Sequence, residues 1–509
     1  MDQMQEQELH SAVERYSRRV TNFVDRHSLA FILILTLVYF TGTVLRARGK
    51  PFWYDELLTV LAATQPTFAA TIQAARDLDL TPPLTDLVGH VVNRVAGSGE
   101  VVFRLPAMVG FWIFCLCLFR FAARRVNTVF ALVAMLLPFL TYGESYAFEA
   151  RSYGMMLGFC GVALWSWQSL TMGIHRGWSF LGLAIGLAGA LACHYYAVLI
   201  YLPLAGAEAF RTLRLRMLDK SVWAAFALGM APLILSLLHV RQVANLNQHV
   251  VLHATRRDYL AFYSSAFANS LWFVVPALIL CAAWLILRRR ESHAESGDPD
   301  QVQVPAWELL AAALFLVIPV AAITISLVVP PHMFADRYAL PSIGGFALAI
   351  ALVSAILAGN RCAPGIILAL PVLLLFGFTM THGRPFENPF EKETMLKRAL
   401  QRGPVVINDY VLYLQLWYYA PADVKQRILY LSDEDLSVKY SHIDDIMQPF
   451  QKYGVPVLSY RAFATPGTEF YLYFSKGLGW VPEKVLDDGG NIQVTDWSQG
   501  TSVLRIRLK

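Results

Sequence analysis

Charged residues are scarce in this chain, and their scarcity is the first constraint on its class. Only 16% of the 509 residues are charged, whereas 56% are hydrophobic, and the mean hydropathy is +0.46. Soluble globular domains carry about 25% charged residues, so the composition excludes an ordinary soluble enzyme. The net charge of +5 predicts no nucleic-acid partner, because the basic residues lie in small groups between apolar segments.

Cysteine is also scarce, and the region from 383 to 509 contains none. All six cysteines lie in or beside apolar segments: Cys115, Cys117, Cys160, Cys193, Cys281 and Cys362. This placement argues against a disulfide framework and against a zinc site built on cysteine. The polar C-terminal region also lacks a phosphate-binding glycine pattern and metal-ligand spacing, and no internal repeat of fixed period is present.

Apolar segments predict about eleven membrane spans, because a crossing helix needs ~20 mostly apolar residues. The first span has no small-residue cleavage site after it and is interpreted as an uncleaved signal anchor. Residues 1–28 combine arginines with apolar residues at helical spacing, which predicts a helix on the cytoplasmic interface. The spans are expected near residues 29–46, 105–120, 127–141, 154–172, 178–193, 196–210, 221–239, 267–287, 305–329, 339–358 and 363–380.

Basic clusters predict the orientation of these spans. They fall in every second connection, which places those connections and the N-terminus in the cytoplasm and the intervening loops outside. The segment 178–210 is expected to form two short helices with His194 at the turn. The third span has only about 14 residues and covers about 21 Å of a ~30 Å core. The outward turn with Glu149, Arg151 and Tyr153 should therefore lie below the membrane surface.

The chain is expected to have three parts. Residues 1–28 form the interfacial helix, and residues 29–382 form the membrane domain, with a first outward loop at 47–104. Residues 383–509 form a small outward α/β domain, interpreted as a lid or docking domain. Its expected strands are Val405 to Ile407, Arg427 to Leu431, Phe470 to Phe474 and Val503 to Ile506.

Carboxylates and arginines gather in the outward loops, and together they favour one kind of chemistry. Asp55 and Glu56 follow the first span directly, while Arg151 and Arg337 lie in later outward turns. A glycosyl phosphate has a leaving group of low basicity, so it needs positive charge more than a general acid. The attacking hydroxyl needs a base, which a carboxylate can supply.

Each candidate also has a structural interpretation. Asp55 and Glu56 could favour a helix N-terminus, and Glu149 could form an ion pair with Arg151. His194 could be a hydrogen-bonded interfacial histidine, and Arg337 could extend toward lipid headgroups. The tyrosines, Tyr153 and Tyr338 included, could belong to an interfacial belt.

Six motifs in fixed order resemble those of the bacterial GT-C glycosyltransferases related to protein O-mannosyltransferases and aminoarabinose (lipid A) transferases. They extend over the whole membrane domain, and the ordered set is more specific than any single motif. The motifs are Phe52 to Glu56, Thr81 to Leu84, Phe103 to Pro106, Glu149 to Tyr153, His194 to Tyr196, and Asp336 to Pro341.

The resemblance implies a mainly α GT-C fold, a polyprenyl-phosphate sugar donor, and an inverting transfer at the outer face of the bacterial inner membrane. It implies that Asp55 is the base and that Arg337 and Tyr338 contact the lipid phosphate. Glu56 is expected to orient Asp55 as part of a catalytic set that includes Glu149. Donor-binding roles are expected for Arg151, Tyr153 and His194.

The expected partners are undecaprenyl phosphate or a similar carrier, membrane lipids, and a lipid, glycan or protein acceptor. No cofactor is expected and a divalent metal is not favoured, because no acidic cluster beyond Asp55 and Glu56 is evident. Two alternatives stay open: a lipid or sugar transporter, and a polysaccharide polymerase or ligase that uses diphosphate-linked donors.

Overall fold

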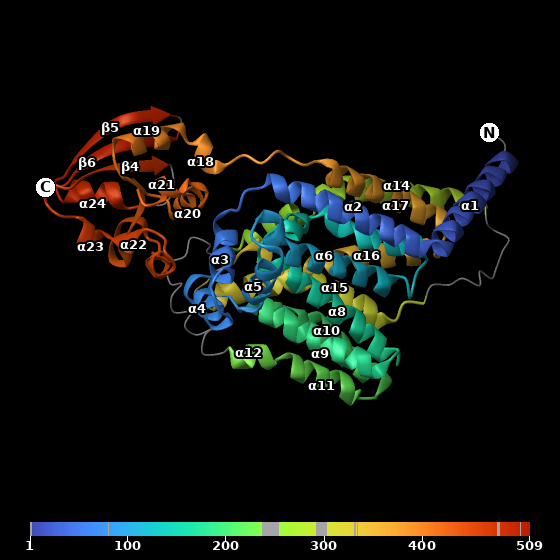
Figure 1. The fold of residues 1–509 in the computed structure, drawn as a ribbon. Coiled ribbons are helices and arrows are strands. Elements are labelled where there is room, and N and C mark those ends of the chain that lie inside the picture. The colour runs from blue at the N-terminus through green and yellow to red at the C-terminus, as the bar shows by residue number, and fades with distance from the viewer. Residues whose placement is uncertain are drawn as a thin grey trace. The chain divides into compact units, whose positions relative to one another are not determined.

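The computed structural model forms two compact units. It describes residues 3–79, 81–236, 254–291, 303–329, 332, 334–475, 479–498 and 500–509. The helical unit contains the described residues within 1–46, 104–237 and 254–383, and the mixed unit contains those within 47–103 and 384–509. Figure 1 shows the elements of both units along the chain.

The helical unit confirms the predicted polytopic helical architecture. Every predicted apolar segment is helical where it is described; residues 237–239, at the end of one of them, lie outside the described residues. The elements are α1 Gln3–Arg26, α2 Ser28–Gly49, α6 Glu100–Ala122, α7 Thr128–Leu136, η1 Leu137–Leu140, η2 Tyr142–Phe148, α8 Ser152–Thr171, α9 Arg176–Cys193, η3 Tyr195–Ile200, α10 Tyr201–Leu215, α11 Lys220–Gly229, α12 Ala231–Leu235, α14 Asp258–Glu291, α15 Ala306–Val328, η4 Asp336–Ala339, α16 Ser342–Leu357 and α17 Cys362–Thr381.

Not every one of these helices is long and apolar enough to cross a membrane by itself. Within the described residues, six meet that condition: α2, α6, α9, α14, α15 and α17. A seventh span results if α7 and η1 are joined to η2 across a 79° bend. The prediction of about eleven spans therefore combines six long helices with shorter or less apolar ones.

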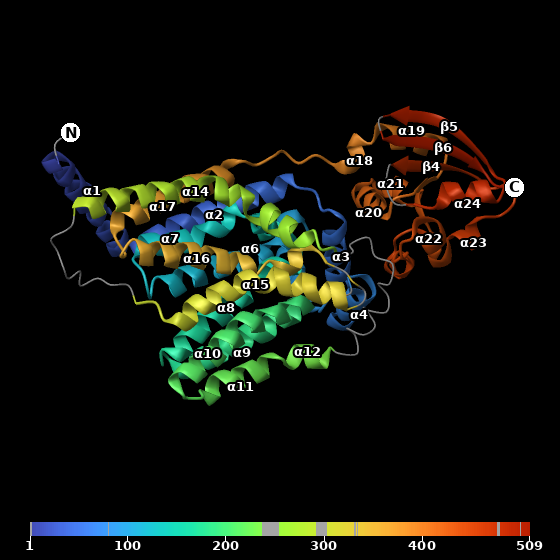
Figure 2. The same ribbon diagram turned by 180° about the vertical axis from the view of Figure 1, so that it is seen from behind.

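Glycines let the helices of this unit pack closely. A Cβ on Gly110 of α6 would lie 2.4 Å from the carbonyl oxygen of Gly154 in α8, and one on Gly158 would lie 2.6 Å from the carbonyl oxygen of Gly110. On the other side of α8, a Cβ on Gly186 of α9 would lie 2.6 Å from the nitrogen of Ala163. Small residues at such contacts are typical of helix packing in membranes. Figure 2 shows α8 and α9 side by side.

Buried ion pairs gather at one end of the helical unit. Arg125, after α6, pairs with the fully buried Glu308 at the start of α15. Gln168, near the end of α8, donates to the same carboxylate at 3.1 Å. We call this end the Glu308 end; Arg125, one of the predicted cytoplasmic basic residues, lies here.

A second ion-pair network fixes the arrangement of α9 and α10. Arg176, at the start of α9, and Arg211, near the end of α10, lie 3.0 and 3.7 Å from the carboxylate of Asp219. Both helices therefore have one terminus at the Glu308 end, and His194 connects them at the other end. The segment thus forms two helices that meet near His194, as predicted, although α9 is itself long enough to cross a membrane.

The mixed unit begins with three short helices from the first loop: α3 Tyr54–Ala63, α4 Phe68–Leu78 and α5 Leu84–Ala96. It continues with a six-stranded sheet in the order β3-β2-β1-β4-β6-β5, in which β3, β2, β1 and β4 are parallel to one another and β6 pairs antiparallel with both β4 and β5. The strands are β1 Val405–Ile407, β2 Ile428–Ser432, β3 Val457–Ser459, β4 Glu469–Ser475, β5 Asn491–Ser498 and β6 Thr501–Arg507. The predicted α/β architecture of the C-terminal region is thereby confirmed.

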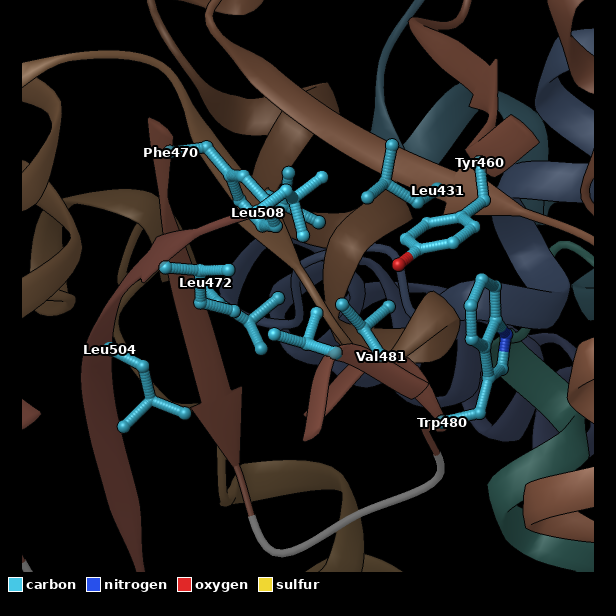
Figure 3. Packing of buried hydrophobic residues seen from close by; sticks show 11 residues of the cluster. Leu431, Tyr460, Phe470, Leu472, Trp480, Val481, Leu504 and Leu508 are labelled. Carbon is cyan, nitrogen blue, oxygen red and sulfur yellow. The ribbon is translucent and has the colours of Figure 1, made fainter. Parts of the chain in front are cut away.

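Helices flank this sheet and complete its core. They are α18 Pro389–Lys392, α19 Thr394–Arg402, α20 Tyr410–Tyr419, α21 Ala422–Lys425, α22 Glu434–Ser441, η5 Gln448–Tyr453, α23 Tyr460–Phe463 and α24 Val481–Asp487. In Figure 3, Leu431 and Leu472 of the sheet lie in one buried cluster with Val481. The ring of Tyr460 meets that of Trp480 edge-on at 5.1 Å. The sheet therefore has its own hydrophobic core.

Candidate functional site

Predicted site residues gather at the end of the helical unit opposite the Glu308 end. Arg151 immediately precedes α8, and Tyr153 lies in the first turn of that helix. His194 follows α9, and Tyr338 lies in η4. These two residues and Tyr153 are buried, with exposed fractions of 6%, 7% and 2%, respectively. We call this group, with Tyr196 and Arg337, the arginine–tyrosine cluster.

Aromatic contacts hold this cluster together. The ring of His194 lies 5.4 Å from that of Tyr153 and 5.2 Å from that of Tyr338. Tyr338 also stacks on Tyr196, with 4.3 Å between ring centroids and 13° between planes. The guanidinium carbon of Arg337 lies 5.9 Å from the centroid of Tyr338. Residues from three separate turns of the chain thus meet around one imidazole.

The charge state of His194 follows from its surroundings. Burial, followed by the positive charges of Arg151 and Arg337, lowers the pKa of His194 from 6.5 to about 3. Its Nδ1 accepts a hydrogen bond from the backbone N–H of Tyr196 at 3.2 Å, and the imidazole is neutral. We therefore assign the ring hydrogen to Nε2, which can donate to an anion.

Glu149 lies beside the cluster, and its surroundings include two residues that sequence reasoning missed. It is 7% exposed and follows η2 directly. Burial and the charge of Glu149 raise the pKa of Tyr146, and the charge of Arg337 lowers it. The ring of Tyr146 lies 5.1 Å from that of Tyr153. Tyr142 donates to the backbone oxygen of Asp336 at 2.9 Å and so connects η2 to η4. The two tyrosines are spaced i and i+4 in the Tyr142–Phe148 segment, the signal that could have identified them.

Asp55 and Glu56 lie in the mixed unit, in the first turn of α3. Trp53 has an extended backbone and precedes the helix, and its N–H donates to the carboxylate of the fully buried Glu56 at 3.4 Å. Glu56 therefore helps to satisfy the helix N-terminus, as its structural interpretation anticipated.

Asp55 is half-buried and lies close to tyrosines of the mixed unit. Burial, followed by the negative charges of Asp409 and Asp55, raises the pKa of Tyr410 to about 12. Burial, Tyr410 and Asp55 also raise the pKa of Tyr54. The Asp55 carboxylate thus has protonated phenols in its surroundings.

No cluster of metal ligands is evident in the described ranges, since no three His, Cys, Asp or Glu side chains there are grouped to hold an ion.

The structure brings Arg151, Tyr153, His194, Arg337 and Tyr338 together in the helical unit. It places Asp55 and Glu56 in the mixed unit. The roles assigned to all of these residues stay predictions.

Comparisons with known proteins agree at the level of the fold. No protein-family model matches the chain, and no protein of curated function matches it in sequence. Among solved structures, ArnT from Cupriavidus metallidurans bound to undecaprenyl phosphate is similar, with a TM-score of 0.51 and 13% identity over 94% of this chain and 97% of that one.

Two further structures have lower scores. Apo ArnT from the same organism has a TM-score of 0.47 at 15% identity, over 95% of this chain and 98% of that one. The arabinosyltransferase EmbB from Mycobacterium smegmatis has a TM-score of 0.36 at 15% identity, over 64% of this chain and 30% of that one. The chain is therefore a multi-pass membrane protein with the fold of the GT-C glycosyltransferases, ending in a small α/β domain.

Proposed function

We propose that this protein is an inverting glycosyltransferase that takes a sugar from a polyprenyl-phosphate carrier at the outer face of a bacterial inner membrane. The acceptor is a hydroxyl or phosphate oxygen of a lipid, glycan or protein. The observation that carries this proposal is the arginine–tyrosine cluster, in which Arg151 and Arg337 surround a neutral His194. A phosphate group, which is a diester in the donor and becomes a monoester when the sugar leaves, is the ligand that such a set of donors suits.

In the proposed reaction, the donor phosphate binds at this cluster. Arg151, Arg337 and His194 Nε2 stabilise the negative charge that grows on the phosphate oxygen as its bond to the anomeric carbon breaks. The electron pair of that bond leaves with the phosphate. Tyr153 and Tyr338 shape the headgroup site, and Glu149 helps to orient the arginines.

The acceptor oxygen attacks the anomeric carbon from the face opposite the phosphate. A new carbon–oxygen bond forms as the old one breaks, which inverts the configuration at that carbon. Asp55 takes the proton of a hydroxyl acceptor, and Glu56 fixes the helix turn that carries Asp55. The crystal structure of ArnT with undecaprenyl phosphate supports the choice of carrier at the level of a shared fold.

The base assignment is tested with Asp55→Asn in purified protein. A panel of polyprenyl-phosphate sugars is incubated with each variant, and release of the free lipid phosphate is measured. We expect Asp55→Asn to lower turnover about 100-fold or more while donor binding is retained, because general-base catalysis contributes 10²–10⁴-fold. Asp423→Asn, which changes an exposed carboxylate of the mixed unit, is the matched control. Full turnover by Asp55→Asn would remove Asp55 from the reaction.

The phosphate site is tested with Arg337→Ala. Loss of a charge-assisted contact of about 1.5–3 kcal/mol should raise the Kd for the donor by roughly 10- to 100-fold. Arg120→Ala, at the exposed end of α6, is the control and should bind the donor normally. Equal donor affinity in the two variants would contradict the assignment.

A further inference from the structure

Helix α20 of the C-terminal domain contacts the chain just before the Asp55 helix. Tyr419 accepts a hydrogen bond from the backbone N–H of Phe52 at 2.7 Å. Gln415 donates from its side-chain amide to the carbonyl oxygen of the same residue, also at 2.7 Å. Because the two side chains are four residues apart, they project from one face of α20. Both backbone polar groups of Phe52 are thus bound by one helix.

These two bonds matter because Phe52 is fully buried. Buried backbone groups need partners, and an unsatisfied one costs about 1–3 kcal/mol. Only Trp53 separates Phe52 from the first residue of α3, and Trp53 O accepts the first helical hydrogen bond from Leu57 N at 3.1 Å. Fixing Phe52 therefore fixes the start of α3 and the direction in which Asp55 projects.

The hydroxyl of Tyr419 makes a second bond. It donates to the carboxylate of Glu100 at 2.9 Å, and Glu100 is the first residue of α6. Burial and this carboxylate raise the pKa of Tyr419, so the hydroxyl stays protonated and able to donate. One phenol thereby connects Phe52, two residues before α3, to Glu100, which begins α6, at the two ends of the first loop.

Further contacts support α3 on the side of Asp55. The ring of Tyr54 meets that of Tyr410 edge-on at 5.2 Å, and its hydroxyl lies 3.9 Å from the sulfur of Met447. Asp445 in turn accepts a hydrogen bond from the backbone N–H of Met447 at 3.0 Å. The α/β domain thus contacts the first turn of α3 as well as Phe52.

We propose that Tyr419 and Gln415 are positioning residues for Asp55, so that the C-terminal α/β domain is a necessary part of the catalytic site. The inference rests on the proposed function, because it assigns Asp55 as the base. Neither residue contacts a substrate in this proposal. Each acts through the backbone of Phe52, and a misplacement of about 1 Å at a reacting group can cost about 100-fold in rate.

The test compares Tyr419→Phe and Gln415→Leu with Tyr413→Phe in the full-length protein. Tyr413 lies on the same helix and donates a partly buried hydrogen bond to the backbone oxygen of Pro456 at 2.8 Å. Tyr413→Phe therefore removes a comparable bond that does not reach the first loop. Two readouts are needed: hydrogen–deuterium exchange of the amides of residues 52–57, and kcat and KM for release of lipid phosphate.

We expect Tyr419→Phe and Gln415→Leu each to speed exchange at residues 52–57 and to lower kcat roughly 10- to 100-fold, with KM for the donor unchanged. Tyr413→Phe should leave both readouts as in the unsubstituted protein. Unchanged exchange, or unchanged kcat despite faster exchange, would overturn the inference. Exchange does not depend on the chemical role of Asp55, so this failure is distinct from a failure of the base assignment, which Asp55→Asn tests separately.

Discussion

His194 is a histidine that its surroundings keep uncharged at physiological pH. Its ring contacts the rings of Tyr153 and Tyr338, and the positive charges of Arg151 and Arg337 act on it. A neutral imidazole adds no third positive charge to a buried cluster, so two arginines can share the site without a further repulsion. The residue is thus suited to donate a hydrogen bond to a phosphate without competing for its proton.

The lowered pKa of His194 makes stability depend on pH. Its pKa falls from 6.5 in the unfolded chain to about 3 in the folded one. As the pH falls below about 6.5, His194 binds a proton in the unfolded state but not in the folded state, so the free energy of unfolding decreases. The associated stability is fully present above pH 6.5 and is lost progressively toward pH 3.

His194→Asn should therefore reduce the loss of thermal stability on acidification. We expect the unfolding midpoint of the unsubstituted protein in detergent to fall more between pH 7.5 and pH 5 than that of His194→Asn. His382→Asn, which changes an exposed histidine after α17, is the control. Parallel pH profiles for all three proteins would show that folding does not lower the pKa of His194.

At the scale of secondary-structure elements, helix α8 is the support on which part of the arginine–tyrosine cluster is built. Arg151 and Tyr153 lie at its start, and glycines on α6, α8 and α9 let it approach its neighbours at backbone distance. No Cβ fits between α6 and α8 at Gly158 unless one helix shifts. The position of the cluster is thus tied to helix packing several turns away.

Gly158→Val should therefore weaken both folding and donor binding. Overpacking a tight contact costs about 1–3 kcal/mol, and displacement of α8 would move Arg151. We expect a lower unfolding midpoint and a higher Kd for the polyprenyl-phosphate donor. Gly377→Val in α17 is the matched control, because a Cβ there has nothing within 4 Å. Equal effects of the two substitutions would contradict the packing argument.

The elements that periodicity describes well were predictable, and the others were not. Long apolar runs located the membrane helices, and the four strands with apolar runs were found close to their observed bounds. Strand β3 has one buried residue among its three, whereas all three residues of β1 are buried, and β5 is an edge strand whose residues are mostly exposed, so neither β3 nor β5 has a clear apolar pattern. The contact of Tyr419 with Phe52 joins residues 367 positions apart, and no local pattern encodes such a pair.

The site shows the same limit. Motifs indicated which residues to group, and Tyr153, His194 and Tyr338 do lie in contact. The neutral state of His194 could not be predicted, because it depends on burial and on charges from other turns. The position of Glu56 at the start of a helix predicted that it could cap the helix. The sequence alone could not decide between this capping role and a catalytic role.

For the whole molecule, we predict that the α/β domain lies outside the cell membrane. The ion pairs of the Glu308 end involve basic residues that the positive-inside bias assigns to the cytoplasm, and the arginine–tyrosine cluster lies at the other end of the same helices. Cysteine labelling checks this. Gln426→Cys in the mixed unit should react with a membrane-impermeant maleimide in intact cells, whereas Lys220→Cys should react only after permeabilisation.

Both positions are exposed. The six natural cysteines form no disulfide, and five of them are buried, so they are replaced by serine or alanine beforehand. Labelling of Lys220→Cys in intact cells would show that the helical unit has the opposite orientation.

The bond between Tyr419 and the two ends of the first loop has a consequence for how the protein is made. Residues 52–100 leave the ribosome long before Tyr419 does. Until Tyr419 is synthesised, the phenol that joins Phe52 to Glu100 is missing. A nascent or truncated chain that ends before Tyr419 therefore lacks the bond that joins the two ends of this loop, whatever the state of its helices. Under the proposed function, such a chain has no positioned base for sugar transfer, which protects the lipid carrier from unfinished copies.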